Sequence, residues 1–434
     1  MRARAKSTAS GRPRRLLVVA NPYPPMASAG TTRVVRFLRH LPENGWEPTV
    51  LAARAAGPAA EPPGVRVVRA PVLWPKRLLG GGRRSTRVNG WVSVPDPYFT
   101  WVGPAVWKGR ELLRGERFDA VFSSSPRPSA HLVAATLARM SGLPWLADYR
   151  DPWSTYQFRT YPTAAHRAAH AHLEAWALHR AAAVTAVNRP IVDDLVARHP
   201  WLAGRAHVLP NGFDRAETPE EVSLGAGFWL VHTGRLYGRE QQVSAFLTGL
   251  AALPPDVKAL FVGVDESRVR PDADRLGLGE RVRVEPLVPL ARALGYQRAA
   301  DGLLLVNGRR PESMSSKVFE YLQAGRPIFA ISPAGSAARA LFAEVGGGTC
   351  VLPDDQMAEP LAAFVGAARD GSAPLADPTA LERYELGRLS TELAALLDDL
   401  AGGQPTAVPG PFAGGPSAAS GAAVTPAPTG RMPG

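Results

Sequence analysis

The sequence predicts an α/β protein built from two doubly wound domains that face each other across a cleft. Short apolar runs alternate with helical patterns along most of the chain, and this alternation is typical of parallel sheets covered on both faces. It occurs in two consecutive series, with a break near residues 205–225. At 434 residues the chain is long enough to form two separate hydrophobic cores.

The first series predicts the N-terminal domain. Residues 16–20 form an apolar run that ends at Asn21-Pro22, which predicts a strand followed by a turn. A helix is predicted over 30–41, because apolar residues recur there at helical spacing. By the same criteria, further strands are expected at 49–52, 65–70, 120–122, 145–147 and 184–187, and helices at 128–140, 165–180 and 190–198.

The second series predicts a C-terminal domain of the same kind, followed by a last helix. Strands are expected at 229–232, 258–262, 282–285, 303–306 and 328–331, and helices at 240–252, 290–299, 316–324 and 336–345. Residues 382–400 are predicted to form a helix with leucines along one face, which could cross back to the first domain.

These patterns divide the chain into successive segments. The beginning is basic and lacks an apolar pattern, and the end is rich in Gly, Pro, Ala, Ser and Thr, so neither is expected to fold. The expected segments are a disordered N-terminus at 1–14, a first domain at 15–205, a second domain at 206–380, the last helix at 381–401 and a disordered tail at 402–434.

Composition excludes several classes of protein. Hydrophobic residues make up 45% and charged residues 20%, as is usual in globular proteins. The single cysteine, Cys350, excludes an internal disulfide framework and a thiolate metal cluster. No apolar run approaches the ~18 residues of a membrane span, and the run after Arg14-Arg15 is too short for a signal peptide. We therefore expect a cytoplasmic protein.

The formal net charge of +12 is partly local. Basic residues concentrate in residues 2–15 and again in residues 76–87. These clusters could be solvated tails and loops, or they could attract anionic lipid or a phosphorylated acceptor. Peripheral contact with the inner face of a membrane therefore stays open. No helix-turn-helix, RNP-like or zinc-finger pattern accompanies the charge, so nucleic acid is not an expected partner.

Two candidate site segments follow predicted strands of the first domain. Gly30 lies in a loop of small residues that enters a helix, which suits an anion but also an ordinary turn. Arg150 and Asp151 directly follow another strand, where they could brace the loop or position an acceptor hydroxyl. His131 lies near a predicted helix N-terminus, either facing the same cleft or serving a structural role.

A third segment, Gly234-Arg235, follows the first strand of the second domain. Arg235 and Arg239 are four residues apart and could both be directed towards one pair of phosphates. Cations held there would stabilise a departing diphosphate without a metal. The alternative is that both arginines are simply solvated.

The fourth segment, 311–327, carries two glutamates around a predicted helix start. If Ser316 caps the helix, Glu320 falls on its second turn and Glu312 lies in the preceding loop. One carboxylate could then hold ribose hydroxyls while the other reaches a sugar hydroxyl. The helix N-terminus between them, with Lys317, would face phosphate.

Taken together, these motifs resemble those of the family 4 glycosyltransferases, retaining enzymes of the GT-B fold, over residues 15–400. The resemblance includes the glycine-containing first loop, Gly234-Arg235 and the paired glutamates; its other motifs are Leu209-Pro210-Asn211-Gly212, Phe319-Glu320-Tyr321-Leu322 and Gly325-Arg326-Pro327. It implies two Rossmann-like domains, with a nucleoside diphosphate sugar donor in the second domain and the acceptor on the first. It also implies no cofactor, no divalent metal and retention by front-face attack.

The resemblance assigns roles to individual residues. It implies that Arg235 contacts the diphosphate, Glu320 the ribose, Glu312 the donor sugar, and that Gly30 lies under the phosphates. The sequence departs from the family in having Ser313-Met314-Ser315 where Gly-Phe-Gly is usual, which leaves the role of Glu312 open.

Two further positions differ from the family pattern. Glu240 stands where the family has a phosphate-binding lysine, so Arg239 is the expected substitute. Arg150-Asp151 stands where many members have a histidine. Arg235, Arg239, Glu312 and Asp151 are thus the candidate catalytic residues; Gly30, Gly234, Lys317 and Glu320 complete the donor site, and His131 and Arg150 the acceptor side.

The sequence leaves the acceptor open among a carbohydrate such as a growing surface polysaccharide, a lipid-linked sugar and a small molecule. Trp91, Tyr98, Phe99, Trp101 and Trp107 form an aromatic stretch that could be core, stack on a sugar or enter a membrane interface. Two other functions remain alternatives: a different GT-B enzyme, such as a sugar-nucleotide epimerase or a hydrolase, and a non-catalytic module that binds nucleotide sugar.

Overall fold

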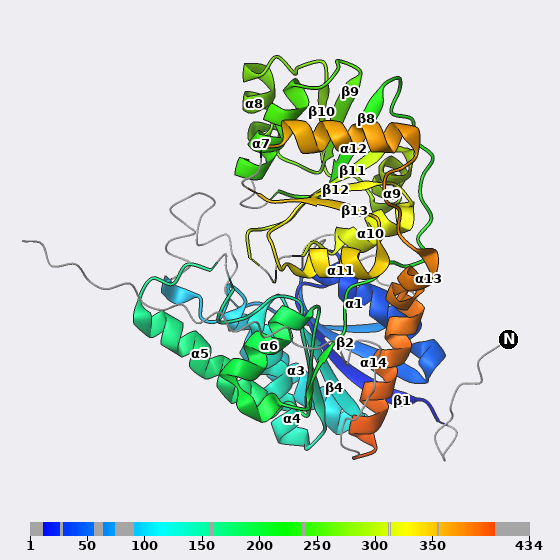
Figure 1. The fold of residues 1–434 in the computed structure, drawn as a ribbon. Coiled ribbons are helices and arrows are strands. Elements are labelled where there is room, and N and C mark those ends of the chain that lie inside the picture. The colour runs from blue at the N-terminus through cyan, green and yellow to red at the C-terminus, as the bar shows by residue number, and fades with distance from the viewer. Residues whose placement is uncertain are drawn as a thin grey trace, which may run out of the picture.

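Two parallel sheets, each covered by helices on both faces, form the two domains of the computed structural model (Figure 1). The structure describes residues 12–26, 29–55, 64–73, 91–156, 159–236, 240–310, 312, 314–353 and 356–403. The sheet of the first domain has the order β3-β2-β1-β4-β5-β6-β7, and that of the second has the order β10-β9-β8-β11-β12-β13. Both follow the doubly wound pattern, so the predicted fold class, two Rossmann-like domains of the GT-B type, is confirmed.

The strands of both sheets are short and largely apolar. They are β1 (Arg14–Ala20), β2 (Trp46–Ala53), β3 (Arg66–Ala70), β4 (Ala120–Ser124), β5 (Trp145–Tyr149), β6 (Ala183–Ala186), β7 (Ala206–Val208), β8 (Phe228–Thr233), β9 (Val257–Val262), β10 (Val282–Glu285), β11 (Gly302–Val306), β12 (Ile328–Ile331) and β13 (Gly348–Val351).

Helices connect most successive strands. The α-helices are α1 (Ala29–His40), α3 (Val102–Gly115), α4 (Pro128–Ser141), α5 (Ala164–Leu178), α6 (Arg189–Arg198), α7 (Glu240–Ala251), α8 (Arg270–Arg275), α9 (Leu290–Ala299), α10 (Lys317–Ala324), α11 (Ala337–Val345), α12 (Ala358–Asp370), α13 (Pro378–Leu381) and α14 (Leu386–Ala401). Short 3-10 helices lie at Pro42–Asn44, Phe99–Trp101, Pro200–Leu202, Glu266–Arg268 and Glu382–Tyr384.

Strand β1 shows why each sheet is buried on both faces. Leu16 and Val18 belong to the core beneath α1 and α14, whereas Leu17 and Val19 belong to the core beneath α3 and α4. Alternate side chains of a strand point to opposite faces, so a strand covered on both sides is apolar throughout. In the second domain, Leu230 and Val231 of β8 divide between two cores in the same way.

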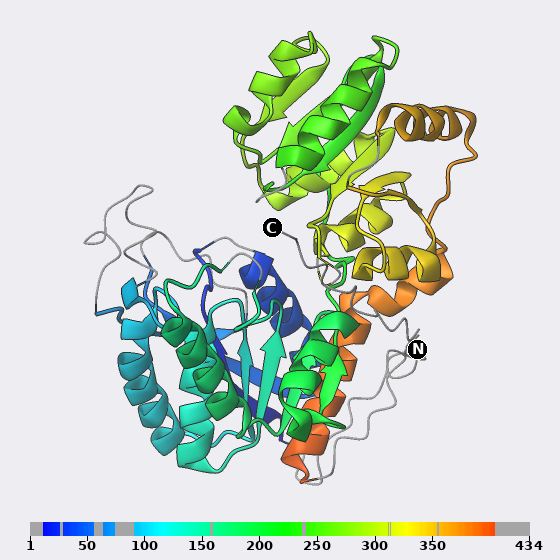
Figure 2. The ribbon, with the colours of Figure 1, turned by 60° about the vertical axis from the view of Figure 1, so that its left-hand side comes forward.

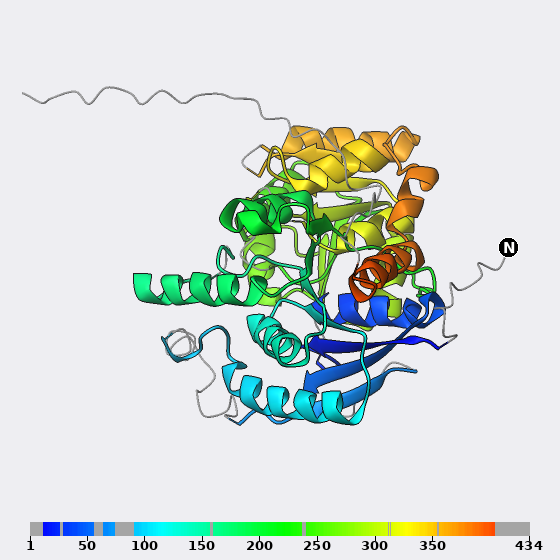
Figure 3. The same cartoon turned by 90° about the horizontal axis from the view of Figure 1, so that it is seen from below.

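Two segments connect the domains. The first runs from the end of β7 to β8, and its residues Leu209 and Phe213 are buried. The second follows α13 and leads into α14, which packs along the first domain (Figures 2 and 3). Asp398 of α14 accepts hydrogen bonds from Arg14 Nη1 at 2.6 Å and from Trp46 Nε1 at 3.0 Å. The first domain therefore contains both early residues and the last helix of the described chain.

The structure differs from the sequence-based expectations at a few elements. Strand β7 pairs with β6, so the first sheet extends past the predicted boundary at 205. Helix α10 begins at Lys317, which puts Glu320 in its first turn rather than the predicted second. Helices α3 and α12 were not predicted; glycine and proline within α3 weaken its helical pattern.

Candidate functional site

The carboxyl ends of the central strands position the predicted site segments. In each sheet the strand order reverses beside the first strand, between β1 and β4 and between β8 and β11. Ligands of doubly wound sheets bind at this switch point, outside the carboxyl ends of the strands. Gly30 follows β1, Gly234 follows β8, and Glu312 follows β11. The topology therefore places all three motifs at switch-point loops.

Gly234 and Lys317, predicted as donor-binding residues, lie in direct contact. Gly234 has a φ of 107°, and a Cβ atom at this position would lie 2.1 Å from Lys317 Cε. Only glycine accepts both this conformation and this approach. The lysine stem therefore crosses the backbone of the loop after β8, and its ammonium lies at the first turn of α10.

Two buried side chains hold the end of β8 against the second domain's helices. The Tyr321 hydroxyl accepts a hydrogen bond from the main-chain N–H of Thr233 at 2.7 Å, and burial raises the pKa of Tyr321 to about 12. Gln297 Nε2 donates to Thr233 Oγ1 at 2.9 Å. Neither residue was among the sequence-predicted site residues. Together they fix the strand end that leads directly into Gly234.

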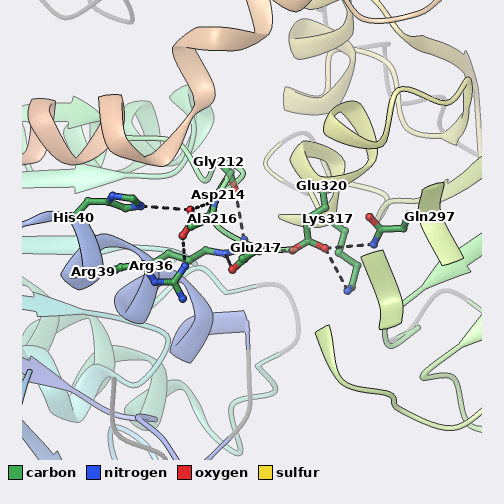
Figure 4. A network of polar contacts seen from close by, with 10 residues as sticks. All are labelled: Arg36, Arg39, His40, Gly212, Asp214, Ala216, Glu217, Gln297, Lys317 and Glu320. Atoms are coloured by element: carbon green, nitrogen blue, oxygen red, sulfur yellow. Dashed lines mark hydrogen bonds and ion pairs between the residues drawn. The ribbon is translucent and has the colours of Figure 1, made fainter. Parts of the chain in front are cut away.

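Glu320 lies at the contact between the two domains (Figure 4). Its Oε1 accepts a hydrogen bond from Arg36 Nη2 of α1 at 3.0 Å, while Lys317 Nζ lies 4.0 Å from its Oε2. The Glu320 side chain is only 7% exposed. The structure thus groups Glu320 and Lys317 as predicted, and adds an arginine from the other domain.

Glu312 also lies where the domains meet. Its main-chain oxygen accepts a hydrogen bond at 3.0 Å from Nδ2 of Asn188, the residue that caps α6 of the first domain. Its carboxylate forms an ion pair with Arg310 at 3.2 Å. The adjacent Pro311 and Ser313 lie outside the described residues.

Gly30, Arg150 and Asp151 gather on the first domain's side. A Cβ atom on Gly30 would lie 2.5 Å from Pro126 Cδ and 3.4 Å from Arg150 Nη1. Arg150 Nη2 forms an ion pair with Asp151 Oδ2 at 3.0 Å, which is the bracing interaction considered from the sequence. Both side chains keep partial solvent exposure, 22% for Arg150 and 27% for Asp151, so the bracing does not remove them from an acceptor's reach.

His131 lies in the core of the first domain and not at the cleft surface. It is fully buried, its ring stacks on Tyr149 at a centroid distance of 4.7 Å, and its Nδ1 forms a hydrogen bond with Ser123 Oγ at 2.8 Å. Burial lowers the pKa of His131 to about 4, so the ring is neutral at pH 7. This placement does not support its expected acceptor contact and corresponds to the structural alternative.

Asp148 forms a buried ion pair that ties α1 to the interdomain segment. Arg33 Nε and Nη2 donate to both Asp148 oxygens, at 2.9 and 2.7 Å, and Arg33 Nη2 also donates to the main-chain oxygen of Leu209. Burial alone would raise the pKa of Asp148, but Arg33 and two hydroxyl donors outweigh it and lower the pKa. The end of β5, the start of α1 and the segment after β7 are therefore fixed together.

The remaining predicted residues are dispersed. Arg235 is exposed immediately after Gly234, and Arg239 lies outside the described residues, as does the basic cluster of residues 76–87. The aromatic stretch divides between core and surface: Trp101 is fully buried, whereas Trp91 and Trp107 are exposed. The core interpretation therefore applies to only part of that stretch.

One group of ligand-type side chains occurs within the described ranges, at the interdomain connections. It consists of His40, Asp214 and Glu385. Asp214 already forms an ion pair with Arg39 and accepts a hydrogen bond from the main-chain N–H of Ala216. Figure 4 shows His40 and Asp214 at the opposite end of the polar network from Lys317. This group is therefore separate from the donor-side loops.

Arg36 is the principal site residue that sequence reasoning missed. Arg33, Arg36 and Arg39 recur every three residues of α1, opposite its apolar positions. That regularity is a signal in the sequence, but charged helix faces are usually solvated. The hydrogen-bond partners of their side chains among the described residues lie at least 115 positions away, with Asp148 the nearest.

Comparison with known proteins agrees with this architecture. Residues 28–212 match the family model described as the glycosyl transferase 4-like domain. No curated protein matches the chain in sequence. Among solved structures, sucrose-phosphate synthase from Thermosynechococcus elongatus is similar with a TM-score of 0.61 and 16% identity, covering 89% of this chain and 96% of that one.

Two further solved structures show the same fold. Anabaena HepE in complex with UDP and glucose has a TM-score of 0.60 and 15% identity, covering 90% of this chain and 98% of that one. WaaG, a glycosyltransferase involved in lipopolysaccharide biosynthesis, has a TM-score of 0.56 and 16% identity, covering 91% and 100%. The chain thus has the GT-B fold, and its residues 28–212 match the glycosyl transferase 4-like domain.

Among the described residues, no helix combines the length and apolar character needed to cross a membrane.

Proposed function

We propose that this protein transfers a sugar from a nucleoside diphosphate sugar to an acceptor hydroxyl with retention of anomeric configuration. The observation that carries the proposal is the meeting of Gly234, Lys317 and Glu320 at the second domain's switch point. A backbone lined by glycine and a cation both suit a diphosphate, and a buried carboxylate suits a ribose. The similar HepE structure is described in complex with UDP-glucose, which supports a donor of this class.

The second domain's residues would act on the leaving group. Negative charge builds up on the diphosphate as the glycosidic bond breaks, and preorganised cations stabilise it. Lys317 lies against Gly234, and Arg235 directly follows it, so both can serve this role. Arg239 is proposed as an additional cation, and Glu312 as the group that holds the donor sugar.

The first domain's residues would position the acceptor. Arg150 and Asp151 are partly exposed beside Gly30, at the carboxyl end of the sheet. Asp151 is proposed to orient the acceptor hydroxyl. The departing phosphate is proposed to accept the proton of that hydroxyl while the hydroxyl oxygen attacks the sugar from the face that the phosphate leaves. Acceptor and leaving group would then lie on one side of the sugar, which gives retention.

The test begins with thermal-shift screening of the full chain against nucleotide sugars, because a ligand of the native state raises the unfolding temperature. The stabilising donor is then incubated with candidate acceptors, and the products and their anomeric configuration are analysed by NMR. We expect a new glycoside of retained configuration. Epimerised donor or free sugar as the only product would establish one of the alternative enzymes instead.

Variants separate an enzyme from a binding module. Glu320→Gln and Arg235→Ala remove a ribose acceptor and a phosphate cation, so both should lower transfer at least about tenfold. Arg189→Ala, in an exposed ion pair with Asp193, serves as the matched control and should retain full activity. Unchanged biological activity in both site variants would favour a non-catalytic module.

We propose that the reaction needs no divalent metal, because Arg235 and Lys317 supply positive charge where the diphosphate would lie. The transfer rate should then be unchanged by EDTA. A rate that collapses with EDTA and recovers with Mg²⁺ or Mn²⁺ would contradict this proposal.

We further propose a cytoplasmic protein with peripheral contact to the inner face of a membrane. The exposed indoles of Trp91 and Trp107 support this contact, because tryptophan favours the membrane–water interface. Cosedimentation with phosphatidylglycerol vesicles should exceed that with phosphatidylcholine vesicles, and Trp91→Ser/Trp107→Ser should weaken it. The acceptor classes then to be tested are lipid-linked sugars, surface polysaccharides and small molecules.

A further inference from the structure

Arg36 forms a direct link between the first domain and the donor glutamate. Its Nε donates to Glu217 Oε1 at 2.8 Å, and its Nη2 donates both to Glu217 Oε2 at 2.5 Å and to Glu320 Oε1 at 3.0 Å. Glu217 belongs to the segment that connects the domains. Figure 4 shows this continuous network from α1 to α10.

The link is buried, so bulk water cannot take the place of its hydrogen-bond partners. The exposed fractions of the Arg36, Glu217 and Glu320 side chains are 5%, 10% and 7%. The nearby cavity between α1, Gly212 and Ser316 measures about 20 Å³, which is room for about one water molecule. The carboxylate of Glu320 therefore depends on its protein partners for both orientation and charge balance.

The charges around Glu320 imply different tasks for its two cations. Lys317 is 4.0 Å from Glu320 Oε2, a loose contact, and its stem lies against the phosphate-binding candidate Gly234. A diphosphate would draw the Lys317 ammonium towards itself. Arg36, on the opposite oxygen, would then remain the cation that faces both Glu217 and Glu320. Although burial opposes its charge, these two carboxylates raise the pKa of Arg36 above its ordinary value.

Hydrogen-bonding capacity shows how Arg36 and a ribose can share one carboxylate. An ionised carboxylate offers about four acceptor positions on its two oxygens. Arg36 occupies one position on Oε1, and Gln297 Nε2 lies 3.5 Å from Oε2. The remaining positions can accept the two hydroxyls of a ribose, provided the carboxylate is held at a fixed rotation.

We propose that Arg36, a residue of the first domain, positions the Glu320 carboxylate for the ribose hydroxyls of the donor nucleotide. This proposal rests on the proposed function, since it assumes a ribose at Glu320. It makes ribose recognition a joint property of both domains. The nucleotide then binds well only while α1 of the first domain remains docked against α10.

The test measures the contribution of the ribose hydroxyls directly. Isothermal titration of the full chain compares UDP, ADP and GDP with their 2′,3′-dideoxy counterparts. The wild-type protein should bind the matching ribonucleotide roughly tenfold or more tightly than its dideoxy form, as expected for hydrogen bonds to a charged group. In Arg36→Met this ratio should fall towards one, with little change for the dideoxy nucleotide.

Arg39→Met is the matched control. Arg39 lies one turn further along α1 and pairs with Asp214 of the same interdomain segment, but no contact links it to Glu320 among the described residues. Its ribose ratio should remain that of the wild type. Glu217→Gln, which weakens the anchoring of the segment but leaves Arg36 beside Glu320, should also retain most of the ratio.

Two further variants complete the test of the role of Arg36. If Arg36→Met does not fold, Arg36→Lys keeps the charge with a shorter reach and should give an intermediate ratio. In Arg36→Met/Glu320→Gln the ratio should equal that of Glu320→Gln alone, because Arg36 acts through Glu320. A wild-type ratio in Arg36→Met or Arg36→Lys, or tighter ribonucleotide binding, would overturn the inference. Wild-type protein that binds none of these nucleotides would count against the proposed function and not against the role of Arg36.

Discussion

At Gly234, the backbone conformation and the contact with Lys317 both require a residue without a side chain. Its φ of 107° and the 2.1 Å approach of Lys317 Cε leave no space for a side chain. Gly234→Ala should therefore strain the loop by about 1–3 kcal/mol and displace Lys317. The displaced ammonium should weaken nucleotide-sugar binding about tenfold, measured by titration calorimetry.

Gly325→Ala provides the control for that effect. Gly325 also has a positive φ, 69°, but no atom lies within 4 Å of the Cβ it would gain. It should lower the unfolding free energy by a comparable amount without changing nucleotide-sugar affinity. Equal losses of affinity in both variants would show that strain alone, rather than displacement of Lys317, accounts for the change.

Helix α1 carries two buried arginines, Arg33 and Arg36, on its polar face. Arg33→Met should leave Asp148 uncompensated in the core and lower the unfolding free energy by about 3–5 kcal/mol. Arg189→Met breaks an exposed pair with Asp193 and should cost less than about 1 kcal/mol. Urea denaturation of both variants measures the two losses, and a small loss in Arg33→Met would contradict the assigned role of the buried pair.

The contact between the end of α1 and the interdomain segment makes stability sensitive to pH. The Asp214 carboxylate, whose Oδ1 lies 3.5 Å from His40 Nε2, raises the pKa of His40 above its ordinary value, with further attraction from Glu385 and Glu43. A raised folded-state pKa adds stability that is complete below the unfolded value and is lost as pH rises through the folded value. The unfolding free energy should therefore fall from about pH 6.5 upwards more steeply in the wild type than in His40→Gln. Parallel pH profiles would contradict this assignment.

The elements were predictable where one local pattern dominates. The apolar run of β1 and the helical period of α1 each identify their element without tertiary information. Helix α3 was missed because Gly103, Pro104 and Gly109 interrupt its pattern, although Leu137 packs against Gly109 and requires a small residue there. In α3, tertiary packing therefore stabilises a helix that the local sequence propensity disfavours.

The site was predictable only in part, for a related reason. Gly234, Lys317 and Glu320 lie in motifs whose residue types indicate phosphate and ribose, and the fold brings them together. The Arg36–Glu320 contact joins residues 284 positions apart, which no local period can indicate. His131 was assigned to the acceptor side although it lies in the core. Its position near a helix start could not show which of the two places its side chain occupies.

Helix α14 follows the second domain in sequence but packs against the first domain, so it joins the two domains. Leu393 of this helix is fully buried in the core beneath β1, whereas Leu361 of α12 is fully buried in the second domain. Either leucine changed to alanine should cost about 2–5 kcal/mol. Hydrogen exchange should accelerate in β1 and β2 for Leu393→Ala, and in β8 and β12 for Leu361→Ala. Faster exchange confined to the second domain in Leu393→Ala would contradict the packing of α14.

This return of α14 sets an order for biosynthesis. Leu16 and Val18 are among the first described residues to leave the ribosome, but Leu389, Leu393 and Leu397, which cover them, are among the last. Domains often fold as units during synthesis, N-terminal first. Here the second domain can complete its core before the first can, and the face of the nascent first sheet that α14 covers stays incomplete until α14 has been synthesised.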